Sequence, residues 1–203
     1  RVLPRGELTR YAARVEIRLT NALLRPWRMD DAAALVACAN NRNISRNLRD
    51  RFPFPYTAAH AEAYLTHKTE VQSDLVFCIE VDGAAAGGIG VHPCDDVYRL
   101  SAELGYWLAE PFWGRGIVTE AVQAVVRQGF NLLPLVRIEA SAFASNPASA
   151  RVLEKCGFTF EGVRRHNVVK DGQILDLLGY SILREECLPQ DHRKQTISAP
   201  PSA

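Results

Sequence analysis

The sequence predicts one α/β domain built around a mixed β-sheet. Two turn signals, Asp82-Gly83 and Asp171-Gly172, each join two apolar segments and predict β-hairpins with antiparallel strands. Two helix starts, one at Ile117 and one at Asn146-Pro147, each follow an apolar segment and predict crossover helices. Because hairpins and crossover helices occur in one chain, the sheet cannot be all parallel.

The first half of the chain is expected to place two helices between its first strand and the first hairpin. Asp30 and Asp31 precede an alanine-rich segment and predict one helix start, and Thr57 can cap a second helix that runs to residue 70. Residues 40–51 are polar and are expected to be irregular or weakly helical, and the prolines of 52–56 exclude regular helix. The expected strands of this half are 15–24, 75–81, 84–91 and 100–108.

The second half is expected to alternate helix and strand before it ends in a hairpin. Apolar residues at helical spacing predict a helix over 117–131. Asn146 is a capping residue, Pro147 suits the first helical position, and Gly157 ends this second helix. The expected strands are 136–143, 158–163 and 174–183.

Length, charge and cysteine usage narrow the functional classes. The 203 residues carry 24 basic and 23 acidic side chains, a balance that gives no support for nucleic-acid or membrane-surface binding. Five scattered cysteines without a C-x-x-C pattern predict neither a disulfide scaffold nor a metal site, and indicate a reducing cytoplasm. We expect a loose leader over 1–14, a domain over 15–186, a disordered tail over 187–203, and a monomer or homodimer.

A glycine turn between a strand and a helix is the first sign of a ligand site. Gly114 and Gly116 lack Cβ, so they can adopt positive φ and let a ligand approach the backbone closely. The helix that follows presents unpaired N–H groups and the positive end of its dipole, which favour a phosphate. A lone G-x-G is a weak signal, because many helix-entry turns carry glycines for packing alone.

Three segments together resemble the GNAT superfamily of acetyl-CoA-dependent N-acetyltransferases. They are Glu103-Leu104-Gly105-Tyr106-Trp107-Leu108, Gly114-Arg115-Gly116-Ile117-Val118-Thr119-Glu120-Ala121, and Asn146-Pro147-Ala148-Ser149-Ala150-Arg151-Val152-Leu153-Glu154-Lys155-Cys156-Gly157-Phe158. The chain looks most like the Rim branch, which acetylates N-terminal amines of ribosomal proteins. The resemblance covers about residues 15–186. It implies a mostly antiparallel twisted sheet, flanked by helices, whose central strand splays away from strand 136–143.

The resemblance also implies a position for acetyl-CoA, the expected acetyl donor. The pyrophosphate would lie on the backbone that starts at Trp113, the pantetheine arm would run along the strand that contains Tyr106, and Asn146 would bind that arm. One departure is Pro111, because the superfamily pattern has Gln or Arg three residues before the first glycine. The cofactor-binding residues expected in this way are Tyr106, Trp107, Leu108, Trp113, Gly114, Arg115, Gly116, Ile117, Val118, Thr119, Asn146 and Ser149.

Acetyl transfer to an amine needs a proton acceptor, an oxyanion donor and a proton for the leaving thiolate. The resemblance makes Glu103 the candidate base or ammonium anchor, the alternative being a solvent-facing strand residue. Ser149 is the candidate proton donor, with helix capping as the alternative. Many relatives carry Tyr at the position of Leu153, which has no proton to give. A strand N–H such as that of Trp107 is the expected oxyanion donor.

The acceptor amine is the least defined part of the prediction. In this fold the Pro-rich loop borders the acceptor site, so Phe54 and Tyr56 are candidate substrate contacts, with core packing as the alternative. The predicted activity is acetylation of a primary amine, such as a protein N-terminal amine. The alternatives are a small amine, polyamine or antibiotic acceptor, and a module that binds acetyl-CoA without catalysis.

Overall fold

The computed structural model describes residues 15–70 and 75–188. The expected leader over 1–14 and the expected tail from residue 189 lie outside the described residues. Cys187, the first residue assigned to that tail, ends a short helix instead. Among the described residues, no helix is long and apolar enough to cross a membrane.

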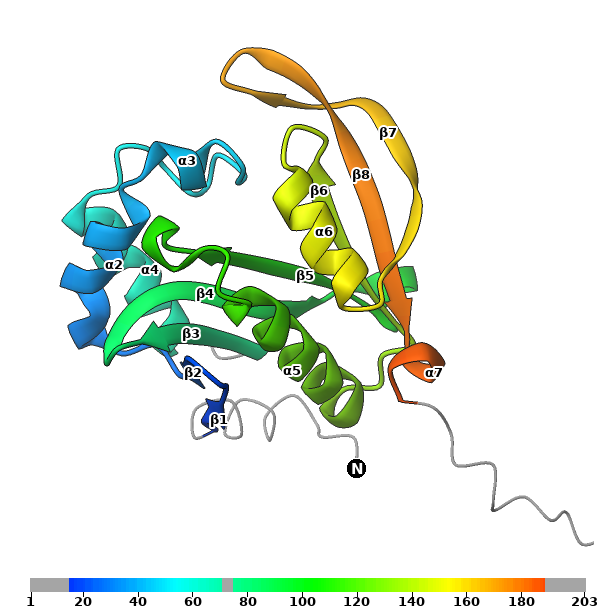
Figure 1. The fold of residues 1–203 in the computed structure, drawn as a ribbon, viewed down its shortest axis with the longest axis horizontal. Helices are drawn as coiled ribbons and strands as arrows, with labels where there is room; N and C mark the ends of the chain where they lie inside the picture. The colour runs from blue at the N-terminus through cyan, green and yellow to red at the C-terminus, as the bar shows by residue number, and fades with distance from the viewer. Residues whose placement is uncertain (1–14, 71–74, 189–203) are drawn as a thin grey trace, which may run out of the picture.

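The described residues form one mixed sheet, as predicted, but it has eight strands where seven were expected (Figure 1). Their order across the sheet is β1-β2-β3-β4-β5-β6-β8-β7, and only the β5–β6 pair is parallel. The strands are β1 (Ile17–Arg18), β2 (Leu23–Arg25), β3 (Leu75–Val81), β4 (Ala84–Pro93), β5 (Ser101–Leu108), β6 (Arg137–Phe143), β7 (Thr159–Lys170) and β8 (Gln173–Leu183).

The two central strands pair over three residues and then separate. Ser101, Ala102 and Glu103 of β5 pair with Arg137, Ile138 and Glu139 of β6, and no pairs follow. Figure 1 shows β5 and β6 diverging from this shared end. The predicted splay is therefore confirmed, and Glu103 lies on the last paired position before the gap.

Helices pack on both faces of β3 and β4, and one helix packs against β6. Side chains alternate along β3, so Phe77 and Ile79 belong to a core with α5, whereas Cys78 belongs to a smaller core with α2 and α4. Figure 1 shows α5 and α6 beside the gap between β5 and β6. The α-helices are α2 (Ala32–Ala39), α3 (Arg42–Ser45), α4 (Ala58–Glu70), α5 (Ile117–Leu132), α6 (Pro147–Lys155) and α7 (Arg184–Cys187).

The prediction of one first strand over 15–24 was wrong in detail. Leu19 N–H bonds Ala22 O at 2.9 Å, which closes a tight turn and makes β1 and β2 an antiparallel pair. Glu120 of α5 accepts a hydrogen bond from Thr20 N–H at 2.9 Å and holds this turn from a distance of 100 residues. The sequence pattern around residues 15–24 gives no sign of Glu120, so it could not predict this turn.

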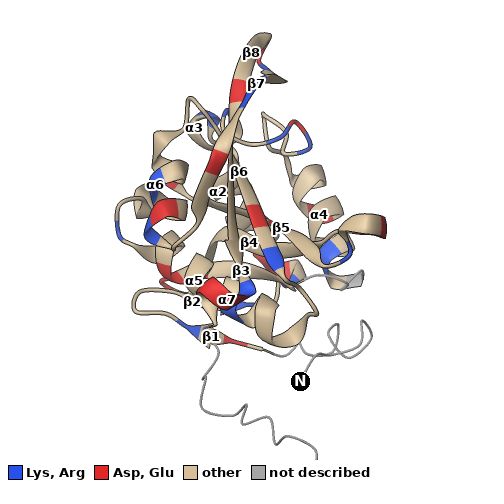
Figure 2. Ribbon diagram, turned by 90° about the vertical axis from the view of Figure 1, so that its right-hand side faces the viewer, with Lys and Arg blue, Asp and Glu red and all other residues tan. Residues whose placement is uncertain are grey.

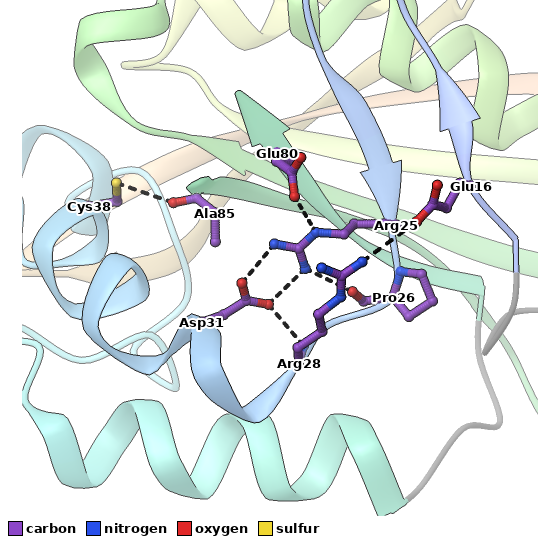
Figure 3. A network of polar contacts seen from close by, with 8 residues as sticks. All are labelled: Glu16, Arg25, Pro26, Arg28, Asp31, Cys38, Glu80 and Ala85. Atoms are coloured by element: carbon purple, nitrogen blue, oxygen red, sulfur yellow. Dashed lines mark hydrogen bonds and ion pairs between the residues drawn. The ribbon is translucent and has the colours of Figure 1, made fainter. Parts of the chain in front are cut away.

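A buried arginine, Arg25, forms a network of ion pairs beside the smaller core (Figure 3). Arg25, only 2% exposed, donates to both carboxylate oxygens of Asp31 at 2.8 and 2.7 Å and also to Glu80. The bond to Asp31 contributes most to raising the pKa of Arg25 above its ordinary value, so the charge persists despite burial. The network joins β2, the start of α2 and β3.

Charges of both signs are interspersed over the helices and strands that the structure describes (Figure 2). This distribution agrees with the nearly neutral composition. Any preference for a charged ligand must therefore come from a local group of charged residues.

Candidate active site

The glycine turn has the geometry that close approach of a ligand requires. Gly114 and Gly116 have φ of 75° and 78°, a region that favours glycine. A Cβ built on either residue would meet no described atom within 4 Å, so the space beside this backbone is open. The turn leads directly into the 16-residue helix α5.

The N–H groups at the start of α5 are available to a ligand. The first bond of the helix runs from Glu120 N–H to Gly116 O at 3.1 Å, so Ile117, Val118 and Thr119 have no partner of their own within the helix. Trp113 differs, because its N–H already donates to Glu110 O at 3.1 Å. The backbone that could hold an anion is therefore residues 114–119, without Trp113.

Two side chains shape this turn without entering the open space. The Trp113 indole Nε1–H donates to Leu108 O at 2.7 Å, and the Arg115 guanidinium lies over the Phe112 ring at 5.2 Å. Together with the free N–H groups and the helix dipole, they make a surface that fits the pyrophosphate of acetyl-CoA. Pro111 lies in the 3₁₀ turn Glu110–Phe112 and does not prevent this arrangement.

The ladder between β4 and β5 decides which N–H groups face the gap. Ala109 N–H bonds Ala86 O and Cys94 N–H bonds Ser101 O, so the odd-numbered residues of β5 exchange bonds with β4. Trp107 is one of these, so its N–H points to β4, and the expectation that it supplies the oxyanion donor was wrong. The N–H groups of Leu104, Tyr106 and Leu108 point toward the gap instead.

A pair of hydroxyls bridges the gap between β5 and α6. Tyr106 OH lies 2.8 Å from Ser149 Oγ and 3.3 Å from Ser149 O. Asn146 caps α6, because its side-chain oxygen accepts the Ser149 N–H at 3.3 Å. Burial raises the pKa of Tyr106 to about 12, so this phenol stays protonated at neutral pH. The Ser149 hydroxyl is thus engaged with Tyr106 rather than with the helix backbone.

Glu103 faces the opposite side of β5 and has a partner that the motifs did not indicate. Its carboxylate forms an ion pair with Arg49, on the segment between α3 and the Pro-rich loop. The Glu103 side chain is 35% exposed, so solvent reaches it. His92 of β4 and Glu139 of β6 stand directly opposite Glu103 on the neighbouring strands.

The two candidate substrate residues differ in their surroundings. Phe54 is 46% exposed, with the Arg42 guanidinium 5.4 Å from its ring. Tyr56 is buried and packs against Phe52 and His60 at ring distances of 5.1 and 5.8 Å. Phe54 is thus available to an acceptor, whereas Tyr56 belongs to the smaller core.

Sequence reasoning also missed a contact between residues 41–43 and the segment before the glycine turn. Glu110 precedes the turn and accepts hydrogen bonds from Asn41 at 2.7 Å and from Asn43 at 3.0 and 3.1 Å. The bond from Asn41 contributes most to holding the pKa of Glu110 below its usual value. The polar character of residues 40–51 was the only signal for this contact.

Cys156 is a structural thiol. Burial raises its pKa to about 11, and its Sγ–H lies 3.5 Å from Thr119 O. A thiol held in its neutral form is a poor nucleophile.

The splayed sheet, the glycine turn and the capped helix α6 are the features expected of an acyltransferase that takes its acyl group from a coenzyme A thioester. Residues 21–159 match the acetyltransferase (GNAT) domain, and the chain belongs to this family. It is an N-acetyltransferase whose acetyl donor is acetyl-CoA.

Several relatives carry this assignment. The chain is 31% identical over 173 residues to the uncharacterized N-acetyltransferase YoaA of Bacillus subtilis, covering 80% of this chain and 93% of YoaA. It is 39% identical over 105 residues to the putative ribosomal N-acetyltransferase YdaF of the same species. That match covers 52% of this chain and 57% of YdaF.

A solved structure shows the same fold. A structure of RimL, a ribosomal L7/L12 α-N-protein acetyltransferase in complex with coenzyme A, superposes with a TM-score of 0.74 at 20% identity. The superposition covers 83% of this chain and 98% of that chain.

Proposed function

We propose that this N-acetyltransferase acetylates primary amines by direct transfer, with Glu103 as the base or anchor for the acceptor amine. The observation that carries the proposal is the position of Glu103 on the last β5–β6 pair. A partly exposed carboxylate at this point can meet an amine that enters beside the splayed strands.

Acetyl-CoA supplies an acetyl group activated as a thioester, and the transfer forms a C–N bond while a C–S bond breaks. Glu103 accepts the first proton from the ammonium, directly or through water, which frees the nitrogen lone pair. Ser149 donates a proton to the leaving sulfur. The nitrogen loses its second proton after the C–N bond has formed, and this proton replaces the one that Ser149 gave to the thiolate. The N–H groups of Tyr106 and Leu108 are oriented to stabilise charge on the carbonyl oxygen.

The acceptor we propose is a protein N-terminal amine, because RimL is named an α-N-protein acetyltransferase and YdaF a putative ribosomal N-acetyltransferase. A small amine is the alternative. The spermidine N(1)-acetyltransferase of Escherichia coli strain K12 is 26% identical over 169 residues, covering 82% of this chain and 88% of that protein.

Replacement of Glu103 tests this proposal. Glu103→Gln keeps the shape of the side chain but removes its ability to hold a proton, so kcat on a peptide acceptor should fall about 100-fold or more. The affinity for acetyl-CoA, measured by calorimetry, should stay within about twofold. Equal turnover at saturating acceptor would remove Glu103 from the mechanism, and absence of turnover in the parent enzyme on every amine would refute the activity.

A further inference from the structure

Residues 41–51 contact Glu103, the segment before the glycine turn and the turn between β7 and β8. Asn41 and Asn43 bind Glu110 at the entrance of the glycine turn. Arg42 pairs with Asp171 at 2.6 Å and Asp50 pairs with Lys170 at 2.7 Å, both on the β7–β8 turn. Between these contacts, Arg49 pairs with Glu103. An acceptor that reaches Glu103 therefore also comes close to Arg49 of this segment.

Arg49 and an incoming ammonium are competing partners of Glu103. A guanidinium keeps its proton under all ordinary conditions, so Arg49 cannot be neutralised and can leave Glu103 Oε1 to the ammonium only by moving. When an ammonium takes its place on Glu103, Arg49 loses its carboxylate partner. An acceptor that brings an anionic group of its own restores the lost pair.

The charge of the segment points to the same class of acceptor. Residues 41–51 contain four arginines, Arg42, Arg46, Arg49 and Arg51, and one acidic residue, Asp50. A polycation that approached Glu103 would be repelled by this segment, whereas an anionic group would be attracted. The fork of a guanidinium also matches a carboxylate or a phosphate in geometry.

We infer that the preferred acceptor carries an anionic group next to its free amine, and that Arg49 is the residue that selects it. The ammonium replaces Arg49 on Glu103, and the anionic group pairs with the released guanidinium. This inference rests on the proposed function of Glu103, and it favours an acidic peptide N-terminus over a polyamine.

The test compares acceptors that differ in one side chain. C-terminally amidated tripeptides Ala-Xaa-Ala, with Xaa as Glu, phosphoserine, Gln or Lys, and spermidine are offered to the parent enzyme and to three variants. Arg49→Gln removes the selecting charge and Arg49→Glu reverses it. Arg46→Gln removes an exposed charge from the same segment and is the matched control.

The parent enzyme should have a kcat/KM at least about tenfold higher for an anionic peptide than for the Gln peptide, corresponding to about 1.4 kcal/mol. The Glu and phosphoserine peptides show which anion fits better. Arg49→Gln should abolish the preference through KM, Arg49→Glu should favour the Lys peptide, and Arg46→Gln should keep the parent preference.

Two other results would overturn the inference. One is a parent enzyme that prefers spermidine or ignores peptide charge, and the other is an anionic preference that survives in Arg49→Gln. In both cases amines are still acetylated, so the proposed function stands. Absence of turnover on every acceptor would instead refute the proposed function and this inference with it. Unchanged acetyl-CoA affinity in each variant shows that the fold is intact.

Discussion

At Gly114, a positive φ and open space beside the backbone occur together. Gly114→Val would add a strained left-handed residue, at a cost of about 1–2 kcal/mol, and two methyl groups where the phosphate is expected. We expect acetyl-CoA affinity to fall by about tenfold or more in calorimetric titration.

The control for this change is Gly83→Val in the β3–β4 turn. Gly83 has φ of 80° and no described atom within 4 Å of an added Cβ, so the backbone strain is the same. This variant should lose a similar amount of stability and bind acetyl-CoA normally. Unchanged affinity in Gly114→Val would exclude the phosphate position.

The Ser149 hydroxyl is separable from helix capping, because Asn146 provides the cap and Tyr106 binds the hydroxyl. Ser149→Ala should therefore cost no more than about 1 kcal/mol of stability. If Ser149 donates the proton to sulfur, kcat should fall about 100-fold while acetyl-CoA affinity changes little. Parent-like kcat, together with a clear loss of thermal stability, would assign Ser149 a purely structural role.

Among the elements, β6, β7 and β8 are joined by a charged cluster. Arg137 of β6 donates to Glu161 of β7 through two nitrogens, and Ser181 of β8 donates to the same carboxylate at 2.8 Å. The hydrogen bonds from Arg137 contribute most to lowering the pKa of Glu161 to about 2.

This lowered pKa predicts a dependence of stability on pH. In the folded state the carboxylate keeps its charge down to a lower pH than in the unfolded state. Its contribution to the free energy of unfolding is therefore full above about pH 4.5 and disappears as the pH falls toward 2. Because Glu161 is 44% exposed, the effect should be below about 1 kcal/mol. In urea titrations, Glu161→Gln should lose less stability than the parent between pH 5 and 2.

Glu62→Gln on α4 changes an exposed carboxylate away from this cluster, and its acid profile should match that of the parent. An acid profile of Glu161→Gln that coincides with the parent's would show that the Arg137 pair does not contribute to stability.

Elements with a local signal were predictable from the sequence, and those with a distant partner were not. The start of α6 depends only on the neighbouring residues Asn146 and Pro147, and its cap forms as expected. The β1–β2 turn depends on Glu120, and the place of Arg49 depends on Glu103, 54 residues away. Motifs predict where the acetyl donor binds, whereas the proposed acceptor side contains long-range ion pairs that no motif indicates.

For the molecule as a whole, the gap between β5 and β6 predicts a specific response to acetyl-CoA. The N–H groups of Leu104, Tyr106 and Leu108 face the gap and pair with no strand of the sheet on that side. A pantetheine arm that binds there should slow the hydrogen exchange of these amides by about tenfold or more. Amides of β4, which lies between β3 and β5, serve as the control. Equal exchange with and without acetyl-CoA would place the arm elsewhere.

The order of the strands also has a consequence for how the chain is made. Strands β1 to β5 are neighbours in both sequence and space, so this meander and the helix α5 that packs on it can assemble before β6 has left the ribosome. The outer edge of β5 then stays unpaired until residues 137–139 of β6 are made. Unpaired strand edges are the places where chains aggregate. In the finished protein most of that edge stays unpaired, and it is the edge at which we propose that the acetyl donor binds. The proposed donor site is thus also the place where a newly synthesised chain most needs protection.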